Sequence, residues 1–284
     1  MSDAAANDRP IFVVGCPRSG TTMLQLMLHA HPRIAIPPET RFLLEGYRRR
    51  RRFGDLRVAD NRRALARWIV TTRATKAHDL GLEPDALIEE IVAGPPTLGS
   101  AMGIVFRAYA RRFGKVRWGD KRPAYATNLD VVLRLFPDAQ IINIVRDPRD
   151  CVASLKEMPW HRAGIEQSIS IWARSVDAAA AAGARLGPAR YHDLSYERLV
   201  REPEPVLRGL CDFLGEPFAA AMTEPASVAE VAVPAGKTWH ERTRRAVSDD
   251  RVETWRSRLT PAEIALCEAV LGARLRARGY EMSG

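Results

Sequence analysis

Residues Ile11–His29 read IFVVGCPRSGTTMLQLMLH, and they set the architecture expected for the whole chain. The four apolar residues at the start are typical of a buried parallel strand. A turn rich in glycine, proline and serine follows, after which apolar residues recur at helical spacing from Met23 to Leu28. Gly15 and Gly20 stand five residues apart, so the turn fits the phosphate-binding pattern G-x-x-x-x-G-K-[ST] everywhere except at the lysine. The stretch predicts a strand, an anion-binding loop and a helix.

The loop itself indicates which anion it binds. Its glycines let backbone N–H groups converge at the positive end of a helix, where an anion is stabilised. The lysine that would contact the outer phosphates of a nucleoside triphosphate is replaced by Thr21, so Arg18 is left to supply charge. The candidate anion ligands are Arg18, Ser19, Gly20, Thr21 and Thr22. We predict a nucleotide-like anion other than magnesium ATP; a tight strand-to-helix connection without a ligand is the alternative.

Composition limits the class of protein. The chain has 284 residues, of which 46% are hydrophobic, enough for a single large domain over 1–284 with a buried core. No run of eighteen apolar residues occurs and the first residues lack the profile of a secretory signal. We therefore expect a cytoplasmic protein with a flexible segment 1–10 and no membrane span. The four cysteines have no C-x-x-C spacing, so neither a disulfide framework nor a metal site is predicted.

The net charge of +9 is concentrated in one stretch. From Arg41 to Arg73 there are eleven arginines and three acidic residues, a local excess of +8, and Arg48–Arg52 is an unbroken arginine run. Such runs are usually solvated, although this one could also attract an acidic substrate or, in a protein of another class, nucleic acid. Because the rest of the chain is nearly neutral, we expect no nucleic-acid partner. Helical patterning from about 42 to 115 predicts an insertion on the substrate side.

Further strands are expected at 33–36, 116–118, 140–145 and 190–193. Strands and helices alternate along the chain, which predicts an α/β fold: a parallel sheet of about five strands flanked by helices. In such a sheet, functional groups gather at the carboxyl ends of the strands. Glu39, Lys121 and Arg146 each follow a predicted strand, so they are candidate site residues. For Glu39 the alternative is a solvated position beside a helix that Thr40 caps and that starts at Arg41.

Two motifs together resemble those of sulfotransferases that use 3′-phosphoadenosine 5′-phosphosulfate (PAPS) and have a P-loop fold. PRSGTTML (Pro17–Leu24) is similar to their 5′-phosphosulfate loop, and IVRDPRDCVAS (Ile144–Ser154) to their 3′-phosphate segment. The resemblance implies that Arg146 and Ser154 hold the 3′-phosphate. These residues lie eight apart, about two helical turns, so they can share a ligand only if the chain bends between them. Adenosine 3′,5′-bisphosphate (PAP) would be the product, and no metal is implied.

Within that family, AHP followed by PETR (Ala30–Pro32 and Pro38–Arg41) resembles the tyrosylprotein-sulfotransferase-like branch. The resemblance implies that Glu39 is the catalytic base and that Lys121, with Arg18, assists the departing phosphate. The resemblance also implies that Arg41 contacts the acceptor and that Tyr196 of SYERLV contacts the nucleotide. It further implies that the stretch 237–251, with Thr243 or Ser248, covers the base of the nucleotide.

The reaction implied is an in-line transfer of a sulfuryl group from PAPS to an acceptor hydroxyl. A P-loop kinase or nucleoside triphosphatase that uses ATP is the alternative. The acceptor is expected to bear a hydroxyl. The arginine run hints at an acidic small molecule or peptide, and hydroxyls of peptide tyrosine, carbohydrate, lipid and secondary metabolites all remain open. If Glu39 is not the base, His29, His31 and His240 are next in line. Neither the identity of the acceptor nor the oligomeric state can be predicted.

Overall fold

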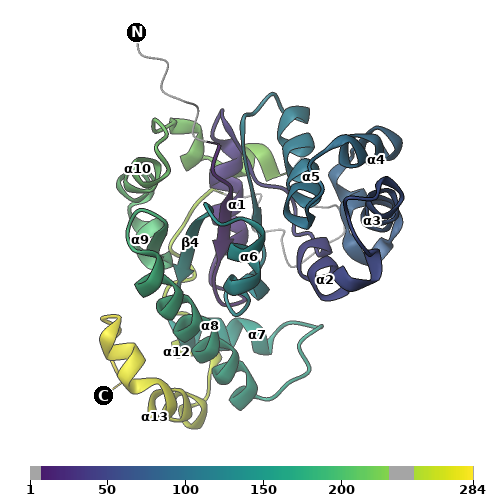
Figure 1. Ribbon diagram of the computed structural model, residues 1–284. Helices are drawn as coiled ribbons and strands as arrows, with labels where there is room; N and C mark the ends of the chain where they lie inside the picture. Colours follow the sequence, from purple (N-terminus) through teal and green to yellow (C-terminus); the bar gives the residue numbers. More distant parts are fainter. Residues whose placement is uncertain (1–7, 230–245, 284) are drawn as a thin grey trace.

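A five-stranded parallel sheet forms the centre of the computed structural model, which describes residues 8–229 and 246–283 (Figure 1). The strands are β1 (Ile11–Val14), β2 (Ile34–Ala35), β3 (Arg117–Lys121), β4 (Gln140–Val145) and β5 (Tyr191–Ser195). Their order across the sheet is β2-β3-β1-β4-β5, and all neighbouring pairs are parallel. The predicted α/β fold is confirmed, and the first strand and its loop lie at the centre of the sheet.

Helices cover both faces of this sheet (Figure 1). The α-helices of the described residues are α1 (Thr21–Ala30), α2 (Phe42–Arg49), α3 (Ala59–Thr71), α4 (Pro84–Ala93), α5 (Leu98–Arg112), α6 (Leu129–Leu135), α7 (Pro148–Lys156), α8 (Ile165–Leu186), α9 (Tyr196–Arg201), α10 (Pro203–Leu214), α12 (Trp255–Arg258) and α13 (Pro261–Ala277). Within the two described ranges, no helix combines the length and the apolar composition needed to cross a bilayer.

The alternation of side chains along β1 builds two cores. Ile11 and Val13 belong to a core with residues of α1, α9 and α10, whereas Phe12 and Val14 belong to one with α5, α6 and the helices after β2. All four β1 side chains are fully buried, and each such burial contributes roughly 1.5–3 kcal/mol. On the second face, aromatic rings surround Phe12; the Trp118 ring stacks on Phe106 at 5.4 Å. β1 is therefore fixed from both sides, and so is the loop that follows it.

The helices α2 to α5 form an insertion between β2 and β3, to one side of the sheet (Figure 1). Its ends lie close to the predicted limits of 42 and 115, because α2 starts at Phe42 and β3 at Arg117. The arginine run, Arg48–Arg52, ends α2 and continues into a 3-10 turn, with every side chain exposed. The division into domains remains a prediction.

The structure differs from one alternative that the sequence left open and from the extent of one predicted segment. Thr40 does not cap a helix: α2 begins after Arg41, and the Thr40 hydroxyl donates to Asp120 at 3.0 Å. The segment predicted to be flexible is also too long, because Arg9 donates to the carbonyls of Asp138 and Ala189 and is already bound to the body of the protein. In both cases the partner lies about 80 residues or more away, beyond the reach of local sequence patterns.

Candidate active site

The loop after β1 requires glycine at two positions. Gly20 has a φ of +95°, and a Cβ there would lie 2.5 Å from the Tyr196 ring. A Cβ on Gly15 would lie 2.5 Å from the Ile144 carbonyl oxygen on the neighbouring strand. The backbone N–H and the hydroxyl of Ser19 both donate to the Cys16 carbonyl, at 3.1 and 2.7 Å. The donors of Ser19 therefore shape the loop, and an anion contact from this residue stays a prediction.

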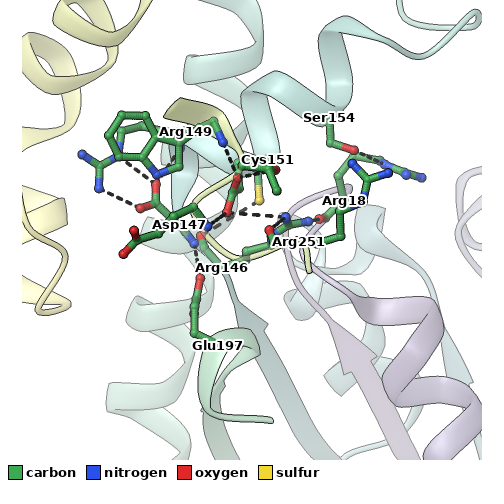
Figure 2. A network of polar contacts seen from close by, with 12 residues as sticks. Arg18, Arg146, Asp147, Arg149, Cys151, Ser154, Glu197 and Arg251 are labelled. Carbon is green, nitrogen blue, oxygen red and sulfur yellow. Dashed lines mark hydrogen bonds and ion pairs between the residues drawn. The ribbon is translucent and has the colours of Figure 1, made fainter. Parts of the chain in front are cut away.

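The two motifs meet at Arg18 (Figure 2). Arg146 follows β4 directly, whereas Ser154 lies on α7, which starts only at Pro148. The chain therefore bends between the two residues, and such a bend is what they need in order to share a ligand. Arg146 donates to the Arg18 carbonyl at 3.1 Å, and Nε of Arg18 donates to the Ser154 hydroxyl at 2.9 Å. Residues more than 120 positions apart in the chain thus form one polar cluster, with Arg18 as the link between its two parts.

Positive charge converges on this cluster. Burial, with Arg146 and then Arg258 and Arg251 as the charged neighbours, lowers the pKa of the Arg18 guanidinium. Arg146 stacks over the Tyr196 ring at 4.5 Å and is only 6% exposed. Its Nε is buried and has no hydrogen-bond partner among the described residues. An anion can accept from a buried guanidinium N–H of this kind, so the residues present fit a nucleotide phosphate at this position.

Sequence reasoning missed Arg251 and Arg258, which reach the cluster from the C-terminal part of the chain. Asp150 brings them there: its carboxylate accepts hydrogen bonds from the backbone N–H groups of Glu253 and Trp255 and contacts Arg146 at 3.5 Å. The carbonyl of Arg251 in turn accepts a hydrogen bond from Arg146 (Figure 2). The signal that could have revealed this contact is Asp150 itself, an acid that follows the strand end by a few residues.

Asp147 is the acid near this strand end that a nucleotide hydrolase could use to order magnesium, but Arg146 and not Asp147 directly follows the strand. Its carboxylate accepts the N–H of Arg149 at the start of α7 and pairs with the Arg149 guanidinium at 2.7 Å (Figure 2). Arg149 also pairs with Glu268 of α13 at 2.7 Å. Within the described ranges, no group of three or more histidine, cysteine or acidic side chains could hold a metal ion. Asp147 therefore joins α7 to the C-terminal helix.

A second polar group lies at the carboxyl ends of β2 and β3. Nζ of Lys121 lies 3.8 Å from a Glu39 carboxylate oxygen and 3.3 Å from the Thr22 hydroxyl of the glycine loop. Nε of Arg122 approaches the other Glu39 oxygen at 3.9 Å, a neighbour that sequence reasoning missed. The Glu39 side chain is 28% exposed, whereas that of Lys121 is 4% exposed. A carboxylate open to solvent thus stands beside a buried cation that also contacts the anion-binding loop.

The other candidates take structural or peripheral positions. Nδ1 of His29 accepts the Ile36 N–H at 3.2 Å, and burial lowers the pKa of His29 to about 4. Nδ1 of His31 accepts the Arg33 N–H, while its Nε2 contacts the Pro217 carbonyl at 2.9 Å. Arg41 is exposed at the start of α2, and the Ser248 hydroxyl bonds to Asp250. His240 and Thr243 lie outside the described residues.

The fold and the two polar groups define an α/β protein with basic and hydroxyl side chains gathered at the carboxyl ends of its central strands. The sequence signature of the Sulfotransferase family matches residues 10–220, which is more than half of the chain. The chain therefore belongs to the sulfotransferase family.

Its relatives include enzymes of the branch predicted from the sequence. Protein-tyrosine sulfotransferase 2 of Gallus gallus is 25% identical over 72% of this chain and 50% of its own length. Nodulation protein NoeE of Sinorhizobium fredii is 28% identical over 96% of this chain and 66% of its own length. The chain thus spans between half and two thirds of these relatives.

Two solved structures share the fold over nearly their whole length. The sulfotransferase domain from the Synechococcus PCC 7002 olefin synthase is 27% identical, with a TM-score of 0.62, and the match covers 95% of this chain and 98% of that one. The sulfotransferase domain from the curacin biosynthetic pathway is 22% identical, with a TM-score of 0.65, and the match covers 97% of this chain and 99% of that one. Because its sequence identity is only 22%, the curacin-pathway domain supports a shared fold and no shared function.

Proposed function

We propose that the protein transfers a sulfuryl group from PAPS to the hydroxyl of an acceptor. The observation that carries the proposal is the link through Arg18. It joins the glycine loop, suited to a 5′-phosphosulfate, to the Arg146 and Ser154 pair, suited to a 3′-phosphate. A nucleotide with phosphates at both ends matches two adjoining anion sites, whereas ATP has its charge at one end only.

The step is an in-line displacement at sulfur. The acceptor oxygen forms a bond to sulfur as the bond from sulfur to the 5′-phosphate oxygen breaks, and that oxygen keeps the electron pair. Glu39 takes the proton of the acceptor hydroxyl, because its carboxylate is open to solvent and lies at the strand ends beside Lys121 and Arg122. Lys121, which contacts both Glu39 and Thr22, stabilises the charge that develops on the leaving oxygen.

The sequence predicts two roles for Arg18, as a ligand of the nucleotide and as a group that assists the departing phosphate. Its side chain contacts Ser154 and its charge adds to that of Arg146, so we assign it to the nucleotide phosphates and assign the leaving oxygen to Lys121. Tyr196 supports the same nucleotide, because its ring packs on Gly20 and under Arg146 and so touches both anion sites.

The acceptor approaches from the insertion. Glu39 precedes α2, and the exposed Arg48–Arg52 run ends that helix, so an acidic small molecule or peptide would be drawn toward the base. The tyrosine sulfotransferases among the relatives make a tyrosine hydroxyl one acceptor to test. Arg41, exposed at the start of α2, is placed to contact such an acceptor.

Nucleotide binding and group transfer test the proposal separately. Thermal unfolding should shift upward with PAP and much less with ATP and magnesium, because only PAP has a phosphate for each anion site. Transfer from ³⁵S-labelled PAPS should then be measured with a peptide that has one tyrosine between glutamates, a phenol, a sugar and an aliphatic alcohol. A larger shift with magnesium ATP than with PAP would instead favour a kinase or nucleoside triphosphatase.

A further inference from the structure

A buried carboxylate that the proposed mechanism does not use lies beside the site. Asp120 is the residue before Lys121 on β3 and pairs in register with Phe12. Successive side chains of a strand point to opposite faces, so Lys121 faces the glycine loop and Asp120 faces the aromatic core around Phe12. Asp120 is fully buried there. A carboxylate among aromatic rings is costly unless each oxygen accepts hydrogen bonds.

Asp120 has three such donors, and they come from different elements. Its Oδ2 accepts the Tyr125 hydroxyl at 2.5 Å and the Thr40 hydroxyl at 3.0 Å, while Oδ1 accepts the Lys121 N–H at 2.8 Å. Thr40 and Tyr125 are also fully buried. Burial raises the pKa of Asp120 to about 6, partly offset by these hydrogen bonds, so the carboxylate is ionised at neutral pH.

The contact with Thr40 matters because Thr40 directly follows Glu39. The segment that carries Glu39 starts with Pro37 and Pro38, which have no N–H to donate. Hydrogen bonds donated by Ile36 and Arg41 hold its two ends. The Thr40 hydroxyl adds a charge-assisted bond in the middle, next to the carboxylate that faces Lys121.

We propose that Asp120 is a positioning residue that sets the separation of Glu39 and Lys121. The Asp120 carboxylate accepts hydrogen bonds from the side chain of Thr40, which directly follows Glu39, and from the backbone N–H of Lys121. One buried carboxylate therefore holds the backbone beside both groups. This inference rests on the proposed roles of Glu39 and Lys121. It assigns to Thr40 and Asp120 no contact with the substrate.

The matched variants are Thr40→Val, which removes the hydroxyl at nearly constant volume, and Thr40→Ser, which keeps it. Because a misplacement of about 1 Å costs on the order of a hundredfold in rate, Thr40→Val should lower kcat by roughly tenfold to a hundredfold. Thr40→Ser should stay within about threefold of the wild type, and PAP affinity should change by less than about twofold in both.

Tyr125→Phe removes another donor to Asp120 but leaves the Thr40 bond, so its kcat should stay close to that of the wild type. Loss of PAP binding in parallel with kcat, or an equal loss in Tyr125→Phe, would overturn the inference.

A double-mutant cycle with Glu39→Gln shows whether Thr40 acts through the base. If it does, Thr40→Val should change the residual rate of the Glu39→Gln protein by less than about threefold, since the group it positions is absent. Equal losses in both backgrounds would overturn the inference but leave the proposed function intact.

Crystal structures of the wild type and Thr40→Val give a test that needs no activity. In the variant the 3.8 Å contact between Glu39 and Lys121 should be lost, and its persistence would refute the positioning role.

Discussion

Arginines differ in their surroundings between two sides of the molecule: the nucleotide side, which is the cluster of Arg18, Arg146 and Ser154 that we propose binds the nucleotide, and the insertion side, which is α2 to α5. Arg146 and Arg149 are nearly fully buried, and each donates to partners far away in the chain. In the run Arg48–Arg52 every side chain is exposed; Arg48 pairs with Glu45 three residues before it, and Arg50 lies over the Tyr47 ring at 4.1 Å. The same residue type is therefore part of the internal structure on one side and a solvated charge on the other.

This difference shows where binding energy and specificity should come from. Buried guanidinium groups held at fixed geometry can recognise a phosphate at a defined position, because their hydrogen bonds are directed and little ordering remains to be done on binding. Exposed arginines act mainly through their field, which attracts anions of many shapes and weakens with salt. We therefore expect changes on the nucleotide side to have large and ligand-specific effects, and changes in the arginine run to have small and general ones.

The largest effect is expected from Glu39→Gln, at the boundary between the two sides. A positioned general base contributes on the order of 10² to 10⁴ in rate, so turnover should fall by that factor. PAP affinity should stay within about threefold of the wild-type value, because Glu39 contacts Lys121 and Arg122 and not the residues around Arg146. Labelled-donor transfer and calorimetry measure the two quantities. Turnover that survives the change would assign the base elsewhere.

Arg146→Ala tests the nucleotide side. A charge-assisted contact to phosphate is worth roughly 1.5–3 kcal/mol, so PAP should bind at least tenfold more weakly. Arg146 also donates to the Arg18 and Arg251 carbonyls, so the variant will lose some order in the site as well. Adenosine 5′-phosphosulfate, which lacks the 3′-phosphate, serves as the control ligand. The loss of order in the site should weaken its binding as well, but it has no 3′-phosphate contact to lose. Equal losses of affinity for both ligands would refute the assignment of Arg146 to the 3′-phosphate.

The part of the site that the sequence predicted is the part built from short segments. The glycine loop follows from residue types within a few positions, and the strand ends bearing Lys121 and Arg146 follow from the alternation of strands and helices. Arg122 escaped because its approach to Glu39 depends on β2 and β3 being neighbours in the sheet, and strand order cannot be derived from pattern alone.

Thr40 shows the opposite failure, because the alternative that it caps a helix follows from a sound local rule and is wrong. Threonine before a helix commonly caps it, but here an acceptor 80 residues away, Asp120, binds the hydroxyl instead. No local pattern marks Asp120, because an acid between a glycine and a lysine is typical of an exposed turn, and only the completed sheet buries it. The family resemblance indicated which groups form the site; the contacts that hold these groups in place are long-range.

His29 tests how the two sides are joined, because it lies in the last turn of α1 and its ring lies 5.9 Å from that of Tyr109 in α5 and 5.0 Å from that of Phe113, which directly follows α5. Its pKa is about 4 in the folded protein, whereas an unfolded histidine titrates near 6.5. The unfolded chain thus binds the proton first, so this contribution to stability is present above about pH 6.5 and is lost as the pH falls toward 4.

Asp120 acts in the opposite sense, because its raised pKa favours the folded state on acidification. The measurement is therefore the difference between the wild type and His29→Gln, which share Asp120. Between pH 7.5 and 5 the wild type should lose about 2 kcal/mol more of its free energy of unfolding in urea than the variant does. Parallel pH profiles for the two proteins would show that His29 is not the group responsible.

The smallest effect is expected from Arg51→Gln combined with Arg52→Gln, because both side chains are exposed. The free energy of unfolding should change by less than about 0.5 kcal/mol, and PAP affinity by less than twofold. If the run attracts acidic acceptors, KM for a glutamate-flanked tyrosine peptide should rise severalfold at low salt, and this rise should vanish at about 0.5 M salt. KM for a neutral phenol should not change under either condition. A rise that is equal for both acceptors would mean that the run shapes the acceptor site by contact and not by its field.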